Sequence, residues 1–183
     1  MLEPDHPIPG LHGLTIGNFW AWAYSDILDN RNRSIFAEYL VAVALDVADH
    51  PRIEWNAYDL IYRSYKIEVK ASAFLQSWQQ ASLSQIKFDV AEKQGWDAAT
   101  NTYADEPRRG SDCYVFCVYA ETDPTAVNVL NVQKWDFYVI PTARLNAKLG
   151  NQKSISLAPL ASLCEAVDFA ILRPSVDNAL GLA

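Results

Sequence analysis

The sequence predicts a mixed α/β (α+β) fold from three segments. Residues 34–48 are helical in pattern and almost entirely apolar, residues 58–70 include alternating apolar and charged side chains, and residues 113–120 are continuously apolar. These patterns are typical of a core helix, a half-buried hairpin and a central strand, in that order. The chain has 183 residues, half of them hydrophobic, so we expect one domain, 1–183, with a substantial core.

Residues 1–30 are expected to form an N-terminal aromatic extension, in which Phe19–Leu28 is a short helix packed on the core. Aromatic side chains at this spacing are more often core residues than platforms for stacking bases. Further elements are expected along the chain: a helix at 73–80, strands at 84–90 and 135–140, and a helix at 142–149 that ends at Gly150.

The helix predicted at 34–48 carries one acid, Glu38, in its first three turns. Ser34 is the expected N-cap, and Asn32 is a second candidate. The segment is apolar nearly all the way round, which indicates a helix covered on most sides. Because a lone buried charge is costly, Glu38 needs a partner. That partner is either an arginine just upstream, Arg31 or Arg33, or a metal held by the next segment.

The segment 58–70 is interpreted as a β-hairpin with charges on one face. Ile67 and Val69 alternate with Glu68 and Lys70, so the apolar pair lies on one side of the strand and the ionic pair on the other. If Arg63-Ser64 forms a two-residue turn, the register pairs Tyr62 with Tyr65 and Ile61 with Lys66, and places Asp59 opposite Glu68.

Two carboxylates in that register have Cβ atoms ~5 Å apart and repel by roughly 3 kcal/mol at an effective dielectric of ~20. A divalent cation reverses the sign of this interaction, and carboxylate oxygens are the ligands that Mg²⁺ prefers. Lys70 would then point at an anion held by the metal. Two acids and a lysine around a hard cation suit phosphodiester cleavage. The alternative is an exposed, solvated hairpin face, since Glu-x-Lys is a common triplet.

A helix bearing Glu38, then a strand with Asp59, then a strand ending Ile-Glu-Val-Lys resembles the PD-(D/E)xK nuclease superfamily, which has the restriction-endonuclease-like fold. The resemblance covers residues 30–72 closely and the two later apolar strands loosely. It implies a mixed β-sheet flanked by helices, in the order α-β-β-β-α-β with extra C-terminal elements. Tyr58 stands where the name of the motif has proline. The combination of Ile-Glu-Val-Lys with Gln-Ser-Trp is also similar to a bacterial branch of this superfamily.

The resemblance implies Mg²⁺-dependent cleavage of nucleic acid, with Mn²⁺ as a substitute. Asp59 and Glu68, with the backbone carbonyl of Val69, are expected to ligate the metal, and Glu38 is the candidate for a second position. Lys70 is expected to orient the attacking water or to offset charge in the transition state.

Some members of the superfamily carry a glutamine on the helix that follows the lysine. Gln76 and Gln79, together with Ser72, are therefore expected nucleic-acid contacts, although a merely polar helix surface is the alternative. The polar segment 91–111 could lie over the substrate, with Arg108 and Arg109 holding phosphates, or be a solvated excursion.

The net charge of −7 argues against strong nucleic-acid binding, because neutralisation of phosphates supplies most of that affinity. Local basic groups permit a positive groove on an acidic protein, and we expect weak, salt-sensitive binding. No secretory segment and no apolar run long enough to span a membrane is visible, and the odd count of three cysteines favours reduced thiols in the cytoplasm.

The expected activity is that of a DNA endonuclease, and a homodimer is a candidate arrangement for double-strand cleavage. Two alternatives remain open at this point. One is a catalytically silent nuclease-fold module for binding or assembly, and the other is an unrelated α/β protein whose hairpin charges have no function.

Overall fold

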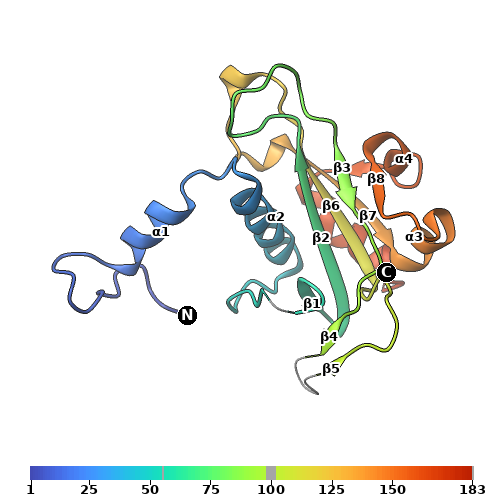
Figure 1. The fold of residues 1–183 in the computed structure, drawn as a ribbon, viewed down its shortest axis with the longest axis horizontal. Helices are drawn as coiled ribbons and strands as arrows, with labels where there is room; N and C mark the ends of the chain where they lie inside the picture. The colour runs from blue at the N-terminus through green and yellow to red at the C-terminus, as the bar shows by residue number, and fades with distance from the viewer. Residues whose placement is uncertain (55, 98–101, 183) are drawn as a thin grey trace.

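The computed structural model describes residues 1–54, 56–97 and 102–182 (Figure 1). The fold is a mixed sheet flanked by helices on both faces, as predicted. Within the described ranges, the main sheet has five strands in the order β1-β2-β6-β7-β9, of which only the β2–β6 pair is parallel. These strands are β1 (Leu60–Tyr62), β2 (Tyr65–Ala73), β6 (Cys113–Tyr119), β7 (Trp135–Pro141) and β9 (Ala166–Val167).

The remaining elements lie around this sheet. Two small antiparallel sheets pair β3 (Lys87–Asp89) with β8 (Ser154–Ser156), and β4 (Trp96–Asp97) with β5 (Thr102–Tyr103). The α-helices are α1 (Ile16–Tyr24), α2 (Asn30–Leu45), α3 (Thr142–Leu149), α4 (Leu157–Ala161) and α5 (Leu172–Ala179). Short 3-10 helices are η1 (Pro124–Ala126), η2 (Val132–Lys134) and η3 (Phe169–Ile171).

The core is divided by the sheet into two apolar layers. On one face, α2 and α5 pack on the sheet through residues such as Val41 and Leu172. On the other face, α3, α4 and the β3–β8 pair contribute residues such as Leu145 and Phe88. Every residue of β6 is buried, which confirms the prediction of a central strand covered on both faces. The predictions of β7 and α3 are confirmed as well.

Helix α2 begins at Asn30, four residues before the predicted start. Its N-cap is Asp29, whose carboxylate accepts a hydrogen bond from Arg31 N at 2.9 Å, so neither Ser34 nor Asn32 is the cap. Most positions of residues 34–45 are buried or half-buried, as the apolar pattern predicts, and the exceptions are Ser34, Tyr39 and Val43. Tyr39 and Val43 face outward and are 55% and 43% exposed.

The hairpin β1–β2 has the predicted turn. Arg63 and Ser64 both have positive φ, 46° and 74°, the conformation that a two-residue type I′ turn requires. The predicted pairs are present, but the ladder ends where Leu60 pairs with Ile67. Asp59 N donates to the carbonyl of Ile67 at 3.1 Å, so Asp59 leaves the register just before it would lie opposite Glu68.

The helix predicted at 73–80 is absent, and the order α-β-β-β-α-β is not seen in this part of the chain. The side chain of Gln80 gives the physical reason. Its Oε1 accepts from Gln76 N at 2.7 Å, and its Nε2 donates to the carbonyl of Phe74 at 3.2 Å. These bonds hold the backbone in a loop, because they use groups that a helix would pair internally.

Helix α1 begins three residues before the predicted start at Phe19 and ends four residues before the predicted end at Leu28, and it is not packed on the core. None of its residues is buried, and Trp22 is 85% exposed. Figure 1 shows this helix standing apart from the body of the fold. Among the described residues, no helix has the length and apolar character needed to cross a bilayer.

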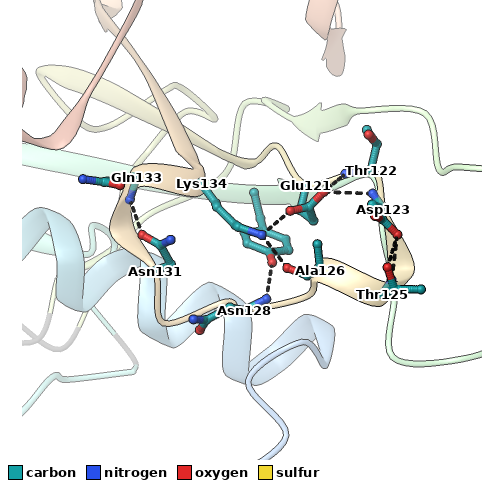
Figure 2. Close-up of polar contacts among 10 residues, drawn as sticks. Glu121, Thr122, Asp123, Thr125, Ala126, Asn128, Asn131, Gln133 and Lys134 are labelled. Carbon is teal, nitrogen blue, oxygen red and sulfur yellow. Dashed lines mark hydrogen bonds and ion pairs between the residues drawn. The ribbon is translucent and has the colours of Figure 1, made fainter.

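The connection between β6 and β7 is held by polar contacts (Figure 2). Lys134, at the end of η2, forms an ion pair with Glu121 and donates to the carbonyl of Ala126. Asn128 N donates to the phenolic oxygen of Tyr119 at 2.8 Å. These contacts close the connection onto the strand ends and so fix where β7 begins.

Candidate active site

The predicted catalytic residues lie around a cavity of about 400 Å³ at the edge of the main sheet. The cavity is bounded by α2, by the segment that leads into β1, by β2 and by β3. The residues that line it include both acidic and basic side chains: Glu38, Glu54, Asp59, Asp89, Arg31, Arg52, Lys70 and Lys87. A groove of this composition suits a ligand that carries both phosphates and a cation.

Glu68 and Lys70 form an ion pair on one face of β2. Lys70 Nζ lies 2.5 Å from Glu68 Oε1, and the two side chains are 23% and 16% exposed. The second carboxylate oxygen of Glu68 accepts from the hydroxyl of Ser111 at 3.3 Å. Lys70 lines the cavity, whereas Glu68 is not part of its lining. Two partners thus hold Glu68 in place beside the groove.

Asp59 faces the same region from the other strand of the hairpin. Its Oδ2 accepts from Val69 N at 2.6 Å, across the gap that opens where the β1–β2 ladder ends. Burial, and after it the negative charge of Glu68, raises the pKa of Asp59 to about 6. Asp59, Glu68 and Lys70 are therefore brought together, as the hairpin interpretation predicts, although Asp59 arrives through a break in the register.

Glu38 does not pair with either predicted arginine. Arg52, in the loop after α2, lies 3.1 Å from Glu38 Oε2 and donates through Nε to both carboxylate oxygens. Arg33 precedes Glu38 by five residues on the helix. That separation rotates its side chain by about 140° from Glu38, so Arg33 points to a different side of the helix. Burial raises the pKa of Glu38, and Arg52 opposes that effect. Glu38 lines the same cavity as Asp59. The negative charge of Glu68 adds to the raised pKa of both acids, and the charge of Glu38 also raises the pKa of Asp59.

Four charged residues of the cavity were missed by sequence reasoning, namely Arg52, Glu54, Lys87 and Asp89. Asp89 and Lys87, at the two ends of β3, both line it. The backbone N–H of Ala91 lowers the pKa of Asp89, with smaller contributions from Lys93 and Lys70. The alternation of Lys87, Phe88 and Asp89 marks both charges as facing away from the core, but it does not indicate that this strand borders β2.

The expected nucleic-acid contacts are only partly brought together. Ser72 and Gln76 line a second cavity beside the first. Gln79 and Arg108 are exposed and line neither cavity, so their role stays a prediction. The expectation for Arg109 is wrong, because its side chain is fully buried and donates to four acceptors within the fold. Residues 98–101 of the expected substrate-facing segment lie outside the described residues.

The donor set of the site fits Mg²⁺ better than a metal that needs an all-protein cage. No group of three or more His, Cys, Asp or Glu side chains placed to hold a metal occurs in the described part of the chain. Mg²⁺ commonly takes one or two carboxylates and completes its shell with water and substrate phosphate. Asp59 and Glu68 supply two. The carbonyl of Val69 points toward Asp59, because both backbone groups of a strand residue face the same side.

In comparisons with known proteins, no family model and no curated protein matches this chain. Support for an activity therefore comes from the side chains of the cavity and from the elements that hold them.

The raised pKa of Asp59 predicts that its charge destabilises the fold at neutral pH. Between about pH 4 and the folded-state pKa of about 6, the unfolded chain releases the proton while the folded chain keeps it. The free energy of unfolding therefore falls as the pH rises through this window, by on the order of 2 kcal/mol. Asp59→Asn should accordingly raise the free energy of unfolding by ~1–2 kcal/mol near pH 7.5, and by nothing measurable near pH 4.

Urea denaturation at the two pH values tests this prediction. Asp112→Asn is the matched control, since the Asp112 carboxylate also accepts a backbone N–H from β2, that of Lys66 at 2.8 Å, but is exposed. We expect the control to change stability by no more than about 0.5 kcal/mol at either pH. Equal behaviour of the two variants would contradict the assignment of a buried, repelled charge to Asp59.

Proposed function

We propose that this protein is a Mg²⁺-dependent nuclease that hydrolyses phosphodiester bonds in nucleic acid, with DNA as the expected substrate and an endonuclease as the expected class. One observation carries the proposal. Two carboxylates that repel each other, Asp59 and Glu68, converge beside a lysine at the rim of a charged cavity. A fold has no structural use for such repulsion, whereas a divalent cation and a phosphate together relieve it.

The connectivity around the cavity supports a restriction-endonuclease-like topology. Helix α2 precedes the antiparallel pair β1–β2, in which Asp59 stands just before β1 and the Glu68-x-Lys70 triplet lies on β2. β6 then runs parallel to β2, and β7 returns antiparallel. The departure from the expected order is the loop after β2, where the superfamily pattern has a helix.

The residues of the site divide the chemistry between them. Mg²⁺ would be held by Asp59, Glu68 and the carbonyl of Val69, and a bound magnesium ion polarises a phosphate and acidifies its own water. Lys70 holds a positive charge at the rim, where it donates to a phosphate oxygen or to the attacking water. Arg31 and Arg52 line the same cavity and offset the charge of the substrate backbone.

Cleavage of supercoiled plasmid and of single-stranded DNA with millimolar Mg²⁺ or Mn²⁺ tests the proposal. Glu68→Ala should lower the cleavage rate by at least about 100-fold, because it removes a metal ligand. The control is Glu165→Ala, at an exposed acid outside both cavities. Mg²⁺ should also raise the melting temperature of the wild type more than that of Glu68→Ala. If wild type and Glu68→Ala cut alike, the activity belongs to a contaminant.

One observation favours a second candidate, a catalytically silent nuclease-fold module that binds nucleic acid. Both carboxylate oxygens of Glu68 already have partners, Lys70 and Ser111. A protein of this kind would bind DNA, cut nothing, and melt at the same temperature with and without Mg²⁺. The cleavage and melting measurements therefore separate the two candidates.

A further inference from the structure

A second cavity, of about 380 Å³, adjoins the candidate active site. The two cavities share Ser34, Ala71 and Lys87 in their linings, so they lie side by side between α2 and β3, and together they are called the groove. The character of the groove changes along its length. The first cavity mixes acids with bases, whereas the described residues that line the second include two cations, Arg33 and Lys87, and no carboxylate. An anion is therefore favoured at this end of the groove.

Arg33 is an unusual cation for a cavity wall, because it is only 4% exposed. Its guanidinium donates to neutral acceptors, the carbonyl of Leu28 at 2.8 Å, Gln76 Oε1 at 3.3 Å and the side chain of Asn30. Its Nε has no hydrogen-bond partner among the described residues. Burial lowers the pKa of Arg33, and Asp29 at the helix cap opposes this only in part. The buried positive charge of Arg33 is thus only partly compensated by the groups around it.

Trp78 adds a flat apolar surface to the same cavity. It lines the cavity and is nevertheless 55% exposed, in the loop that replaces the predicted helix. Hydroxyl and amide groups of Ser72 and Gln76 lie in the same wall. A cationic pocket with an open indole and several polar groups has the parts that single-stranded nucleic acid requires, namely phosphate neutralisation and base stacking.

We propose that the second cavity binds a nucleotide of single-stranded nucleic acid next to the scissile phosphate, with its phosphate on Lys87, attracted also by the buried charge of Arg33, and its base on Trp78. This inference rests on the proposed function, since it takes nucleic acid to be the substrate. Lys87 contacts both cavities, so it couples the two ends of the groove. A strand that lies along the groove would present one phosphate to the end that mixes acids with bases and the next to the end that carries cations alone.

The test measures binding of a fluorescent oligothymidine and of an abasic strand of the same length, in EDTA, so that no cleavage interferes. Trp78→Ala should weaken binding of the oligothymidine by roughly 5- to 100-fold and leave binding of the abasic strand unchanged. Lys87→Ala should weaken both strands and lower the slope of log K against log salt by about 0.7. Trp22→Ala and Lys148→Ala, at an exposed tryptophan and an exposed lysine far from the lining, are the matched controls.

The outcomes separate this inference from the proposed function. One outcome is that the protein cleaves nucleic acid and Trp78→Ala binds the oligothymidine as tightly as wild type does. This outcome would overturn the nucleotide site and would still support the proposed nuclease activity. Strand binding that depends on Trp78 and Lys87, together with no cleavage in the presence of any metal tested, would support the nucleotide site and contradict the proposed nuclease activity. Failure of the wild type to bind either strand, or equal loss of the abasic strand in Trp78→Ala, overturns the site as well.

Discussion

Replacing Lys70 by Met should lower metal-dependent cleavage by roughly 10²–10³-fold while the protein stays folded. Methionine keeps most of the length of the side chain and removes the charge. The ammonium of Lys70 lies 2.5 Å from Glu68, and Lys70 lines the cavity. In the proposed reaction, charge would develop on a phosphate bound there. Its ion pair with Glu68 is partly exposed, so the loss of stability should stay near 1 kcal/mol or below.

Lys66→Met is the matched control, because Lys66 lies on the same strand and on the same face as Lys70 but is exposed and lines neither cavity. Single-turnover rates over a range of Mg²⁺ concentrations separate two effects of the change. A lower rate at saturating Mg²⁺ identifies a contribution to the reaction itself, and a shifted Mg²⁺ midpoint identifies an effect on Glu68. Wild-type rates in Lys70→Met at all Mg²⁺ concentrations would exclude a catalytic role for this lysine.

The second large effect concerns stability and arises at Arg109. Arg109→Ala should lower the free energy of unfolding by about 3–5 kcal/mol. The guanidinium donates to the carbonyls of Val90 at 2.7 Å, Gly150 at 3.0 Å and Gln152 at 2.7 Å, and to Asn146 Oδ1 at 2.8 Å. It thereby joins the end of β3 to the connection between α3 and β8. Truncation leaves buried acceptors without a donor, and that desolvation penalty is the main cost.

Arg108→Ala provides the control within the same dipeptide, since Arg108 is exposed and should change stability by no more than about 0.5 kcal/mol. Arg109→Lys should recover little, because one ammonium cannot reproduce the planar fork that reaches several acceptors. Urea denaturation of the three variants gives the comparison. Equal midpoints for Arg108→Ala and Arg109→Ala would show that the hydrogen bonds of Arg109 contribute no net stability.

The elements predicted correctly are those that a local pattern specifies. Period-two alternation gave the strand and its two faces, with Ile67 and Val69 toward the core. The register followed from the assumption that Arg63-Ser64 is a two-residue turn, which the structure confirms. The continuous apolar run gave β6, because a strand covered on both faces has no polar side. The pairing of Glu68 with Lys70 follows from the same alternation, and it holds without knowledge of the rest of the fold.

The features that sequence reasoning missed depend on tertiary contacts. Arg52 reaches Glu38 only because the loop after α2 turns back over the helix, and no periodic pattern records that turn. Gln80 prevents the predicted helix through hydrogen bonds to Phe74 and Gln76 that glutamine forms only in this particular loop. The burial of Arg109 is a third case, since arginine in a polar segment is ordinarily exposed.

The two-residue turn at Arg63 and Ser64 has a consequence for how this segment can change in length. β2 is locked along its other edge by seven residue pairs with β6, so the orientation of Glu68 and Lys70 does not depend on the turn. The position of Asp59 does depend on it, because β1 is the edge strand of the sheet and pairs with β2 alone. Insertions of odd and even length in this turn therefore differ in their effect. An odd insertion exchanges the two faces of β1 and moves the carboxylate of Asp59 away from the cavity, while the ammonium–carboxylate pair on β2 stays in place.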